Sequence, residues 1–553
     1  MPQPDTIHGL VGPLERGLAV LRTLARAPDG RMYASELVTA TGLARSPVDR
    51  IATTLANLGY LREEDRELVL APPLLALGSA YLRSSGVPAA LDPLAARLAD
   101  QLDESVSVAV PDGDGVRFVV QHTRRRALTV SFRVGDALPA DRCAPGPLFA
   151  AEWPAERYVA RRPGTPEEFP ALPALRGPRL GDAEFRALAA DAAARGWSQD
   201  DGLIEPGLVA VAVPVRDSQG RTVCALSAVS HTSRHSAQDL RHHALEPLRR
   251  TAARMTDALA ALGPSAPLPA LMTDPTAQAK QDLGPEYLQS LARGLAVLEA
   301  LGCTPGGMTL SNVAQATGLA RATARRSLLT LEQLGYVAGD GGLFSPLPQI
   351  LDLGYPLLAG LSLGEVAQFH LADLVRQVRE SASVAVLDGP DVRYVSRVAA
   401  TRIMSVTIAL GTRFPAHATS MGRVLLAGMP RTERTRWLAS ADLRPLTDLT
   451  LTDPGALGRV LDQVERDGYA LVDQELEKGL RSVAAPVHGA GGTVVAAVNV
   501  SLHAGRTSEE ETRETILPAL RATAARITAD WSAVEGAAGR WRLSDGCHRA
   551  CRG

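Results

Sequence analysis

Leucine residues recur every three or four positions in two stretches of the chain that lie 277 residues apart. This spacing places them on one face of an amphipathic helix, because 3.6 residues complete a helical turn. The chain is therefore expected to form the same leading helix twice. The two sets are Leu14, Leu18, Leu21 and Leu24, and Leu291, Leu295, Leu298 and Leu301.

The pattern after each leading helix predicts a winged helix-turn-helix. A second short helix, around residues 35–39 and 311–316, ends at a Thr-Gly step, where glycine can take the left-handed conformation. A third helix follows at once, in "RSPVDRIATTLANLGY" and "RATARRSLLTLEQLGY", and a Gly-aromatic step then leads into a hairpin. Two copies with the same spacing make this prediction specific.

The remainder of each copy predicts an α+β domain. An apolar helix and a longer helix ending in Glu-Ser-x-Ser-Val precede a strand pair broken by a turn. Further strands alternate with helices, including a strand at residues 405–410 and a pair at "LRSVAAPVHGAGGTVVAAVNVSL". Strands and helices in this order favour an antiparallel sheet flanked by helices.

The duplication extends over almost the whole chain. "ESVSVAV" returns as "ESASVAV", and "GWSQDDGLIEPGLVAVAVPV" returns as "GYALVDQELEKGLRSVAAPV". A Pro/Ala/Gln-rich segment joins the copies and is typical of a flexible linker. The sequence therefore predicts two tandem units, each with a winged helix followed by a sensor domain.

Composition narrows the class of protein. The chain has 553 residues and 46% hydrophobic content, enough for several well-filled domains. No apolar run is long enough for a membrane span and no signal peptide begins the chain, so a cytoplasmic location without membrane contact is expected. Five scattered cysteines fit a reducing compartment. Cys547, His548 and Cys551 offer three potential metal ligands without a fourth, so we expect a disordered tail, no metal site and no cofactor.

The third helix supplies candidate DNA contacts, because in this motif its first residues meet base edges and phosphates in the major groove. We expect Ser46 to cap this helix in the first copy, where Asp49 is unfavourable near phosphates. The alternative is an interaction module with solvated arginines. The candidates are Arg45, Ser46, Val48 and Arg50 in the first copy and Arg321, Thr323, Arg325 and Arg326 in the second.

Charge gives these helices no general affinity for DNA. Residues 1–72 hold eight Arg and nine Asp or Glu, and residues 285–348 hold four of each. An acidic wing at residues 63–67 weakens the first copy further. Binding to double-stranded DNA should then depend on a few well-placed arginines.

These segments resemble the IclR family of bacterial transcription regulators, which join a winged helix-turn-helix to a GAF-like effector-binding domain. "GTRFPAHATSMGRVLLA" and "DQELEKGLRSVAAPV" resemble the branch that controls protocatechuate, 4-hydroxybenzoate and β-ketoadipate metabolism. Since such regulators act as dimers or tetramers, the chain resembles a dimer fused into one polypeptide. The expected domains are winged helices at 10–72 and 287–348, effector-binding domains at 73–262 and 349–533, a linker at 263–286 and a tail at 534–553.

The resemblance implies a small organic acid as effector in the second copy. Thr419 or Ser420 would cap a helix whose N-terminal end attracts an anion. The first copy has Pro145 and Pro147 there, so we expect it to be degenerate. Thr419 and Ser420 could equally form a plain helix cap, and Arg481 could pair with a nearby carboxylate. The implied effector contacts are Ser420, Met421, Asp473, Arg481, Ser482, Asn499 and Ser501.

Three classes of function follow from these patterns. The favoured one is a ligand-responsive regulator that binds an imperfect palindrome, since its two recognition helices differ, and whose fused chains could associate again. The second is a ligand-binding sensor that has lost DNA binding. The third is an enzyme, which is disfavoured because the sequence shows no nucleophile elbow, phosphate loop or metal-ligand spacing.

Overall fold

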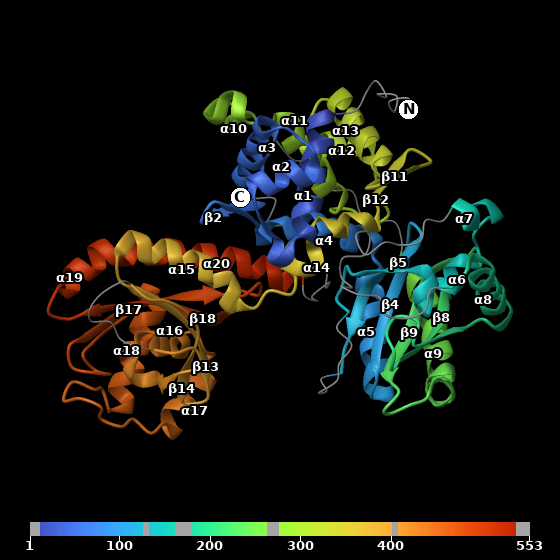
Figure 1. Ribbon diagram of the computed structural model, residues 1–553. Coiled ribbons are helices and arrows are strands. Elements are labelled where there is room, and N and C mark those ends of the chain that lie inside the picture. The colour runs from blue at the N-terminus through green and yellow to red at the C-terminus, as the bar shows by residue number, and fades with distance from the viewer. Residues whose placement is uncertain (1–10, 125–131, 161–179, 263–275, 401–407, 538–553) are drawn as a thin grey trace. The chain divides into compact units, whose positions relative to one another are not determined.

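The computed structural model describes residues 11–124, 132–160, 180–262, 276–400 and 408–537 (Figure 1). These residues form two compact units, which divide at residues 358 and 359. The predicted linker up to residue 275 and the tail from residue 538, with Cys547, His548 and Cys551, lie outside the described residues.

The first unit begins with a winged helix-turn-helix. Its leading helix α1 (Gly12–Arg26) buries the predicted leucine face, and Gly42 ends the second helix with φ of 67°. Its third helix begins at Arg45 with Ala44 as N-cap, so the prediction that Ser46 caps this helix was wrong. The remaining elements are η1 (Pro28–Gly30), β1 (Arg31–Tyr33), α2 (Ala34–Thr41), α3 (Arg45–Asn57), β2 (Leu61–Glu64) and β3 (Glu67–Leu70), with sheet order β1-β3-β2.

The second winged helix repeats this arrangement within the same unit. Gly318 ends its second helix with φ of 65°, as Gly42 does in the first copy. Its elements are α11 (Gln289–Leu301), β10 (Met308–Thr309), α12 (Leu310–Thr317), α13 (Arg321–Gln333), β11 (Val337–Asp340) and β12 (Leu343–Pro346). Connecting helices are η2 (Pro72–Leu74) and α4 (Leu75–Ser85) after the first copy, α10 (Thr276–Leu283) and η4 (Gly284–Glu286) before the second, and η5 (Pro348–Leu353) and α14 (Tyr355–Leu358) after it.

The two winged helices pair through α1 and α11 (Figure 1). A Cβ atom on Gly17 would lie 2.3 Å from Leu291 Cδ1, and one on Gly294 would lie 2.4 Å from Leu14 Cδ2, so a larger residue at either position would displace the facing leucine. Equivalent hydrogen bonds also cross the pair: Val11 N donates to Thr330 Oγ1 at 3.1 Å and Leu288 N donates to Thr54 Oγ1 at 2.9 Å. Matched contacts in both directions are the mark of a pseudo-two-fold axis.

The first effector domain contains a six-stranded antiparallel sheet in the order β6-β5-β4-β9-β8-β7. Helices α5 and α9 pack together on one face, and α6 packs on the other with α8 against it. The elements are α5 (Val87–Leu102), β4 (Ser105–Asp112), β5 (Gly115–His122), β6 (Ala137–Pro139), η3 (Ala140–Arg142), α6 (Pro145–Ala150), α7 (Ala155–Ala160), α8 (Asp182–Arg195), β7 (Ser198–Asp201), β8 (Leu208–Arg216), β9 (Thr222–His231) and α9 (Ala237–Ala260).

The second unit is the second effector domain, with the same antiparallel topology in the order β15-β14-β13-β18-β17-β16. One hydrophobic core lies between the sheet and α15 with α20, and another lies between the sheet and α16 with α18. The elements are α15 (Leu363–Val378), β13 (Ser381–Asp388), β14 (Asp391–Val398), β15 (Arg413–Pro415), η6 (Ala416–Ala418), α16 (Ser420–Ala427), α17 (Arg431–Ser440), α18 (Pro454–Asp467), β16 (Ala470–Asp473), β17 (Leu480–His488), β18 (Val494–His503), α19 (Glu509–Glu511), η7 (Thr512–Ile516) and α20 (Leu517–Ala537).

The predicted α+β class and the tandem duplication are confirmed. The strand predicted at 405–410 was wrong where it can be followed, because residues 408–410 form no strand and residues 405–407 lie outside the description. In the described part of the chain, no helix combines the length and apolar character that a membrane crossing needs.

Candidate functional site

The second recognition helix, α13, presents its arginines to solvent. Arg321, Arg325 and Arg326 are exposed, whereas Thr323 is half-buried. Within the described residues none of the three arginines forms an ion pair. Their guanidinium groups are therefore available for the phosphate and guanine contacts predicted from the sequence.

The first recognition helix, α3, differs because its candidate side chains are engaged by the protein. Arg45 Nε donates to both carboxylate oxygens of Asp49, at 2.8 and 3.0 Å. Arg50 donates to Pro285 O through Nε at 3.0 Å and Nη2 at 2.7 Å. Ser46 is exposed. Val48 has no exposed surface and packs with Ile51 and Leu55, so its predicted contact with a base was wrong.

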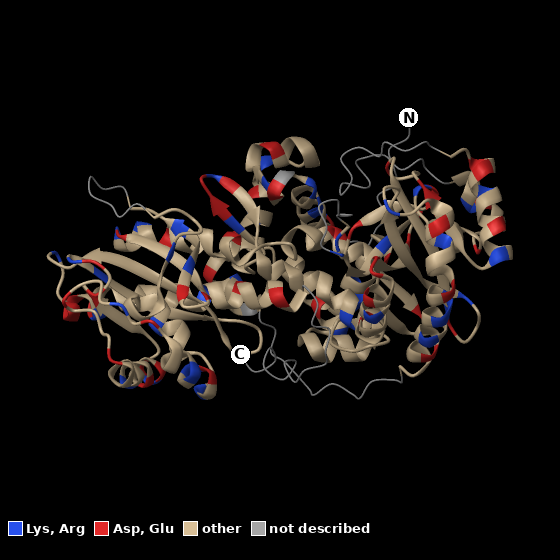
Figure 2. Cartoon of the chain, turned by 90° about the horizontal axis from the view of Figure 1, so that it is seen from below, with Lys and Arg blue, Asp and Glu red and all other residues tan. Residues whose placement is uncertain are grey.

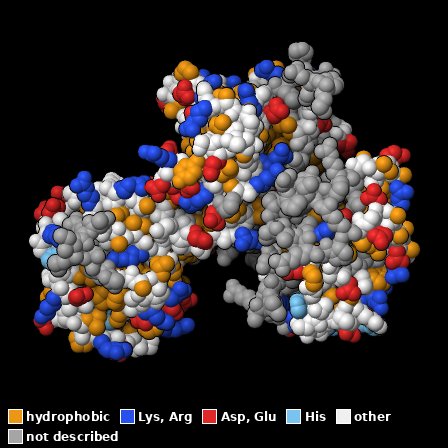
Figure 3. All heavy atoms as spheres, in the orientation of Figure 1, with side chains coloured by type: hydrophobic (Ala, Val, Ile, Leu, Met, Phe, Trp, Pro, Cys, Tyr) orange, Lys and Arg blue, Asp and Glu red, His pale blue; other side chains and the backbone are white. Residues whose placement is uncertain are grey.

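Charge around these helices is mixed in sign. Basic and acidic residues are interspersed along the described helices (Figure 2), and the coloured side chains on the face in Figure 3 form no continuous basic surface. The first wing is strongly acidic, with Arg31 within 3.4 Å of both Glu64 and Glu67. The expected lack of a broad basic footprint therefore agrees with the arrangement of the charges.

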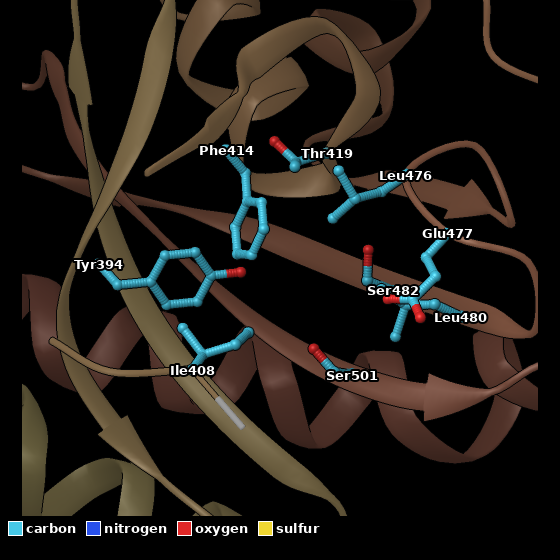
Figure 4. Close-up of a pocket in the computed structure, with 9 residues that line it drawn as sticks. All are labelled: Tyr394, Ile408, Phe414, Thr419, Leu476, Glu477, Leu480, Ser482 and Ser501. Carbon is cyan, nitrogen blue, oxygen red and sulfur yellow. The ribbon is translucent and has the colours of Figure 1, made fainter. Parts of the chain in front are cut away.

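The second effector domain contains a cavity of about 230 Å³ between its sheet and the N-terminal end of α16. Tyr394, Ser482 and Ser501 come from the sheet, and their hydroxyl groups lie around a common space that Thr419 also lines (Figure 4). Five further side chains complete the lining: Ile408, Phe414, Leu476, Glu477 and Leu480. A small ring would meet four apolar side chains here, with the hydroxyls of Tyr394, Ser482 and Ser501 and the carboxylate of Glu477 as the polar groups around it.

Thr419 also caps α16, because its Oγ1 accepts a hydrogen bond from Gly422 N at 3.1 Å. The cavity therefore lies at the positive end of this helix dipole. Ser420 and Met421 are buried in the first turn, and Ser420 Oγ has no hydrogen-bond partner within the described residues. Glycine is required at position 422, because a Cβ atom there would lie 2.1 Å from Ala416 O.

Arg397 is a cation on the sheet face that carries the cavity, outside its nine lining residues, and the sequence analysis missed it. A β-bulge between Val384 and Ala385 adds one residue to β14, so Arg397 lies on the same face of the sheet as Tyr394. Its Nη1 donates to Ser383 Oγ at 3.3 Å, and burial lowers its pKa. Strict alternation along the strand would have placed it on the opposite face.

Arg397 lies in one row of the sheet with Ser383 and Asn499, between Tyr394 and Ser501. Asn499 Nδ2 donates to Ser501 Oγ at 3.2 Å, while its buried Oδ1 has no partner within the described residues. This row therefore provides a cation, a hydroxyl and an unsatisfied amide oxygen on the sheet face that carries the cavity. A carboxylate beside a ring is the natural partner of the arginine.

Arg481 and Asp473 do not line the cavity. Neighbouring residues of a strand face opposite ways, so Arg481 lies on the α20 face while Ser482 lies on the α16 face. Arg481 Nε donates to Asp473 Oδ1 at 2.9 Å, which is the carboxylate pairing left open by the sequence. The pair braces β16 against β17 and takes no direct part in the cavity.

An ion pair holds the loop that closes one side of the cavity. Arg423 of α16 donates from Nη2 to Glu475 Oε2 at 2.6 Å, and Leu451 N donates to the same oxygen at 2.9 Å. Thr450 Oγ1 donates to Glu475 O at 2.6 Å. The neighbouring residues Leu476 and Glu477 line the cavity, so this pair fixes their position.

The first effector domain has a hydrophobic cluster where the second has its cavity. Strand registers align Ser482 with Ala210, Ser501 with Val229 and Asn499 with Ser227, which resolves the register of the last strand. Gln121 takes the place of Arg397. The counterparts of eight lining residues all belong to one buried cluster: Phe118, Phe132, Leu138, Cys143, Ile204, Leu208, Ala210 and Val229.

This cluster is closely packed and apolar. The rings of Phe118 and Phe132 stack with centroids 5.1 Å apart. In α6, Pro145 and Pro147 replace Met421 and Arg423, and no side chain caps the helix. The hydroxyls, the cation and the cap of the second domain are thus all absent from the equivalent positions of the first.

Among the residues that the structure describes, no group of three or more His, Cys, Asp or Glu side chains is placed to hold a metal ion.

Comparisons with known proteins agree with this architecture. Residues 13–65 and 290–341 match the IclR helix-turn-helix domain, and residues 181–257 and 357–529 match the C-terminal domain of the bacterial transcriptional regulator IclR. The "Pca regulon regulatory protein" of Pseudomonas putida is 43% identical over 43% of this chain and 82% of its own length.

Two further relatives have similar coverage. The "p-hydroxybenzoate hydroxylase transcriptional activator" of Acinetobacter baylyi is 36% identical over 43% of this chain and 90% of its own length. The crystal structure of transcriptional regulator RHA06195 from Rhodococcus sp. RHA1 is 52% identical, with a TM-score of 0.42, over 45% of this chain and 99% of that one. The two curated regulators are each matched over most of their length by less than half of this chain, which agrees with the repeated domain matches. The chain therefore belongs to the IclR family of transcriptional regulators, with both domains of the family present twice.

Proposed function

We propose that this regulator binds one small aromatic acid per chain, in its second effector domain, and that the first effector domain has become a structural partner. The observation that carries this proposal is the exchange of a polar cavity for a hydrophobic cluster at equivalent positions. A ligand in the first domain would have to displace stacked rings and would find glutamine at the position of Arg397.

The chemistry of the second cavity favours a single-ring carboxylic acid. Its volume of about 230 Å³ is below the roughly 300–1,000 Å³ typical of sites for drug-sized ligands. Arg397 suits the carboxylate and the hydroxyls of Ser482 and Ser501 suit ring substituents. The names of two relatives, which refer to the Pca regulon and to p-hydroxybenzoate hydroxylase, point to the same ligand class.

DNA is the proposed macromolecular partner, bound at an imperfect palindrome. Exposed arginines on α13 support this over the alternative of a sensor without DNA binding. Ligand binding would shift the population between arrangements of the chain that differ in DNA affinity. Association of two fused chains is compatible with this scheme and is tested by the molar mass of the free and DNA-bound protein.

Calorimetric titration of the whole chain tests the ligand proposal. We expect 4-hydroxybenzoate or protocatechuate to bind with one site per chain, and β-ketoadipate serves as the acyclic comparison. Ser501→Val, which introduces the residue that the first domain has at this position, should abolish the heat of binding. Its matched control, Val229→Ser in the first domain, should leave one site. Two sites per chain, or unchanged binding by Ser501→Val, would contradict the proposal.

A further inference from the structure

The two recognition helices of one chain offer DNA different surfaces, although their backbones are equivalent. Arg321, Arg325 and Leu329 follow one another at intervals of four residues on α13, so they share one face. Leu329 is 46% exposed, an unusual position for a large apolar side chain on such a charged helix. Arginine suits the acceptors of guanine, and an apolar side chain suits the methyl group of thymine.

The equivalent face of α3 is electrically neutral. Asp49 stands at the position of Arg325, and it binds the guanidinium of Arg45, which stands at the position of Arg321. Thr53 replaces Leu329. A DNA phosphate would have to compete with Asp49 for Arg45, and it would meet the carboxylate as well.

The second arginine of α3, Arg50, is held by the segment before the second winged helix. Arg50 makes two hydrogen bonds to Pro285 O, and η4, which contains Pro285, packs against α3. Arg326, its counterpart on α13, is exposed and forms no ion pair within the described residues. At both positions where the two helices carry arginine, the arginine of α3 is bound by the protein and the arginine of α13 is exposed.

The wings also differ in charge, which adds to the difference between the two winged helices in their attraction to DNA. Glu63, Glu64, Asp65 and Glu67 lie in and around the first wing, whereas Asp340 is the acidic residue of the second. A wing lies beside the DNA backbone when the recognition helix is in the groove, so the first wing repels phosphates more strongly.

From these contacts we infer that the second winged helix reads sequence while the first mainly completes the pair, so that the operator has one informative half-site and one permissive half-site. This inference rests on the proposed DNA-binding function. Arg321, Arg325 and Leu329 are the specificity-determining side chains, with guanine and thymine as the bases that their chemistry fits.

Selection from a random duplex library with the full chain tests the inference. We expect the enriched sequences to contain one conserved half-site, while the position one helical turn away, or a multiple of it, varies. Arg325→Ala should lower affinity for the selected duplex by about 10-fold to 100-fold, the usual effect of losing a bidentate base contact. Arg45→Ala should lower it by less than about 3-fold, because Asp49 already neutralises this side chain.

A gain-of-function variant makes the test independent of loss of folding. Asp49→Arg gives α3 the arginine spacing of α13, so selection with this variant should enrich a second conserved half-site. Asp257→Arg adds the same charge on the exposed face of α9 and should leave the selected sequence unchanged. Two equally conserved half-sites with the unaltered chain would overturn the inference while leaving DNA binding intact. Failure to enrich any duplex would overturn DNA binding and the inference together.

Discussion

A single charged residue distinguishes the two effector domains most clearly. Arg397 supplies a cation beside Tyr394 and Asn499, and Gln121 occupies the same position in the first domain. The amide of Gln121 has no hydrogen-bond partner for either terminal atom within the described residues. The first domain therefore keeps the geometry of this position but has lost the charge that an acid would seek.

Replacing Arg397 by Gln should weaken acid binding by about 10-fold to 100-fold, because a hydrogen bond to a charged group contributes about 1.5–3 kcal/mol. Calorimetry with 4-hydroxybenzoate measures the change. Arg393→Gln is the matched control, since Arg393 lies on the same strand, is exposed and pairs with Asp388. Equal losses in both variants would remove Arg397 from the site.

Part of this site could be predicted from residues alone. The repeat already showed that Ala210 stands at the position of Ser482, because the aligned segments of the two copies have the same length. Alternation along the strand would already have separated Arg481 from Ser482, and the spacing of Val48, Ile51 and Leu55 would have shown that Val48 is buried. Arg397 was beyond such reasoning, since only the bulge beside Ala385 places it on the sheet face that carries the cavity.

Asp200 gives the first effector domain a pH-dependent stability. Its carboxylate is buried, and burial raises its pKa from 3.8 to about 7. Because the folded pKa is above the unfolded value, its contribution to stability is complete below about pH 4 and is lost as pH rises through about 7.

Asp200→Asn should therefore raise the unfolding temperature of this domain at pH 8 and change it little near pH 4, as scanning calorimetry would measure. A difference of one unit between the folded and unfolded pKa of Asp200 corresponds to about 1.4 kcal/mol in the free energy of unfolding. The exposed neighbour Asp201 provides the control, and a benefit for Asp201→Asn as large as that for Asp200→Asn would argue against burial as the cause.

At the scale of elements, the leading helices determine how the DNA-binding half is assembled. Gly17 and Gly294 let α1 and α11 approach closely, and Thr54 and Thr330 tie each helix end to the other copy's third helix. The repeat predicted both helices and their apolar faces. It could not predict their mutual contact, because equal faces could also pair between two chains.

Gly17→Ala should destabilise the paired winged helices, although alanine favours a helix over glycine by about 1 kcal/mol. The added methyl group would overlap Leu291, at 2.3 Å from Cδ1, and force the helices apart. Gly458→Ala in α18 is the control, because its nearest neighbour would lie at 3.6 Å. Thermal unfolding should show a loss for the first variant and none for the second; the reverse order would refute this packing.

At the scale of the whole molecule, the affinity for DNA should fall less steeply with salt concentration than it does for a protein with a broad basic surface. Three exposed arginines on α13, with no ion pair among the described residues, and the acidic first wing indicate few neutralised phosphates. With about three to five such contacts, the slope of log K against log salt should lie near −3 to −5. Fluorescence anisotropy between about 50 and 200 mM salt measures it, and a slope near −10 would mean that a wider basic surface takes part.

The hydrophobic cluster in the first domain also determines the shape of the response curve. Under the proposal of one ligand per chain, both recognition helices respond to a single binding event. Gene output should then follow ligand concentration along a hyperbola with a Hill coefficient near one, where a dimer of separate subunits can respond steeply. Because phenylalanine and valine side chains fill the equivalent space in the first domain, gene output should rise gradually with ligand concentration and show no threshold.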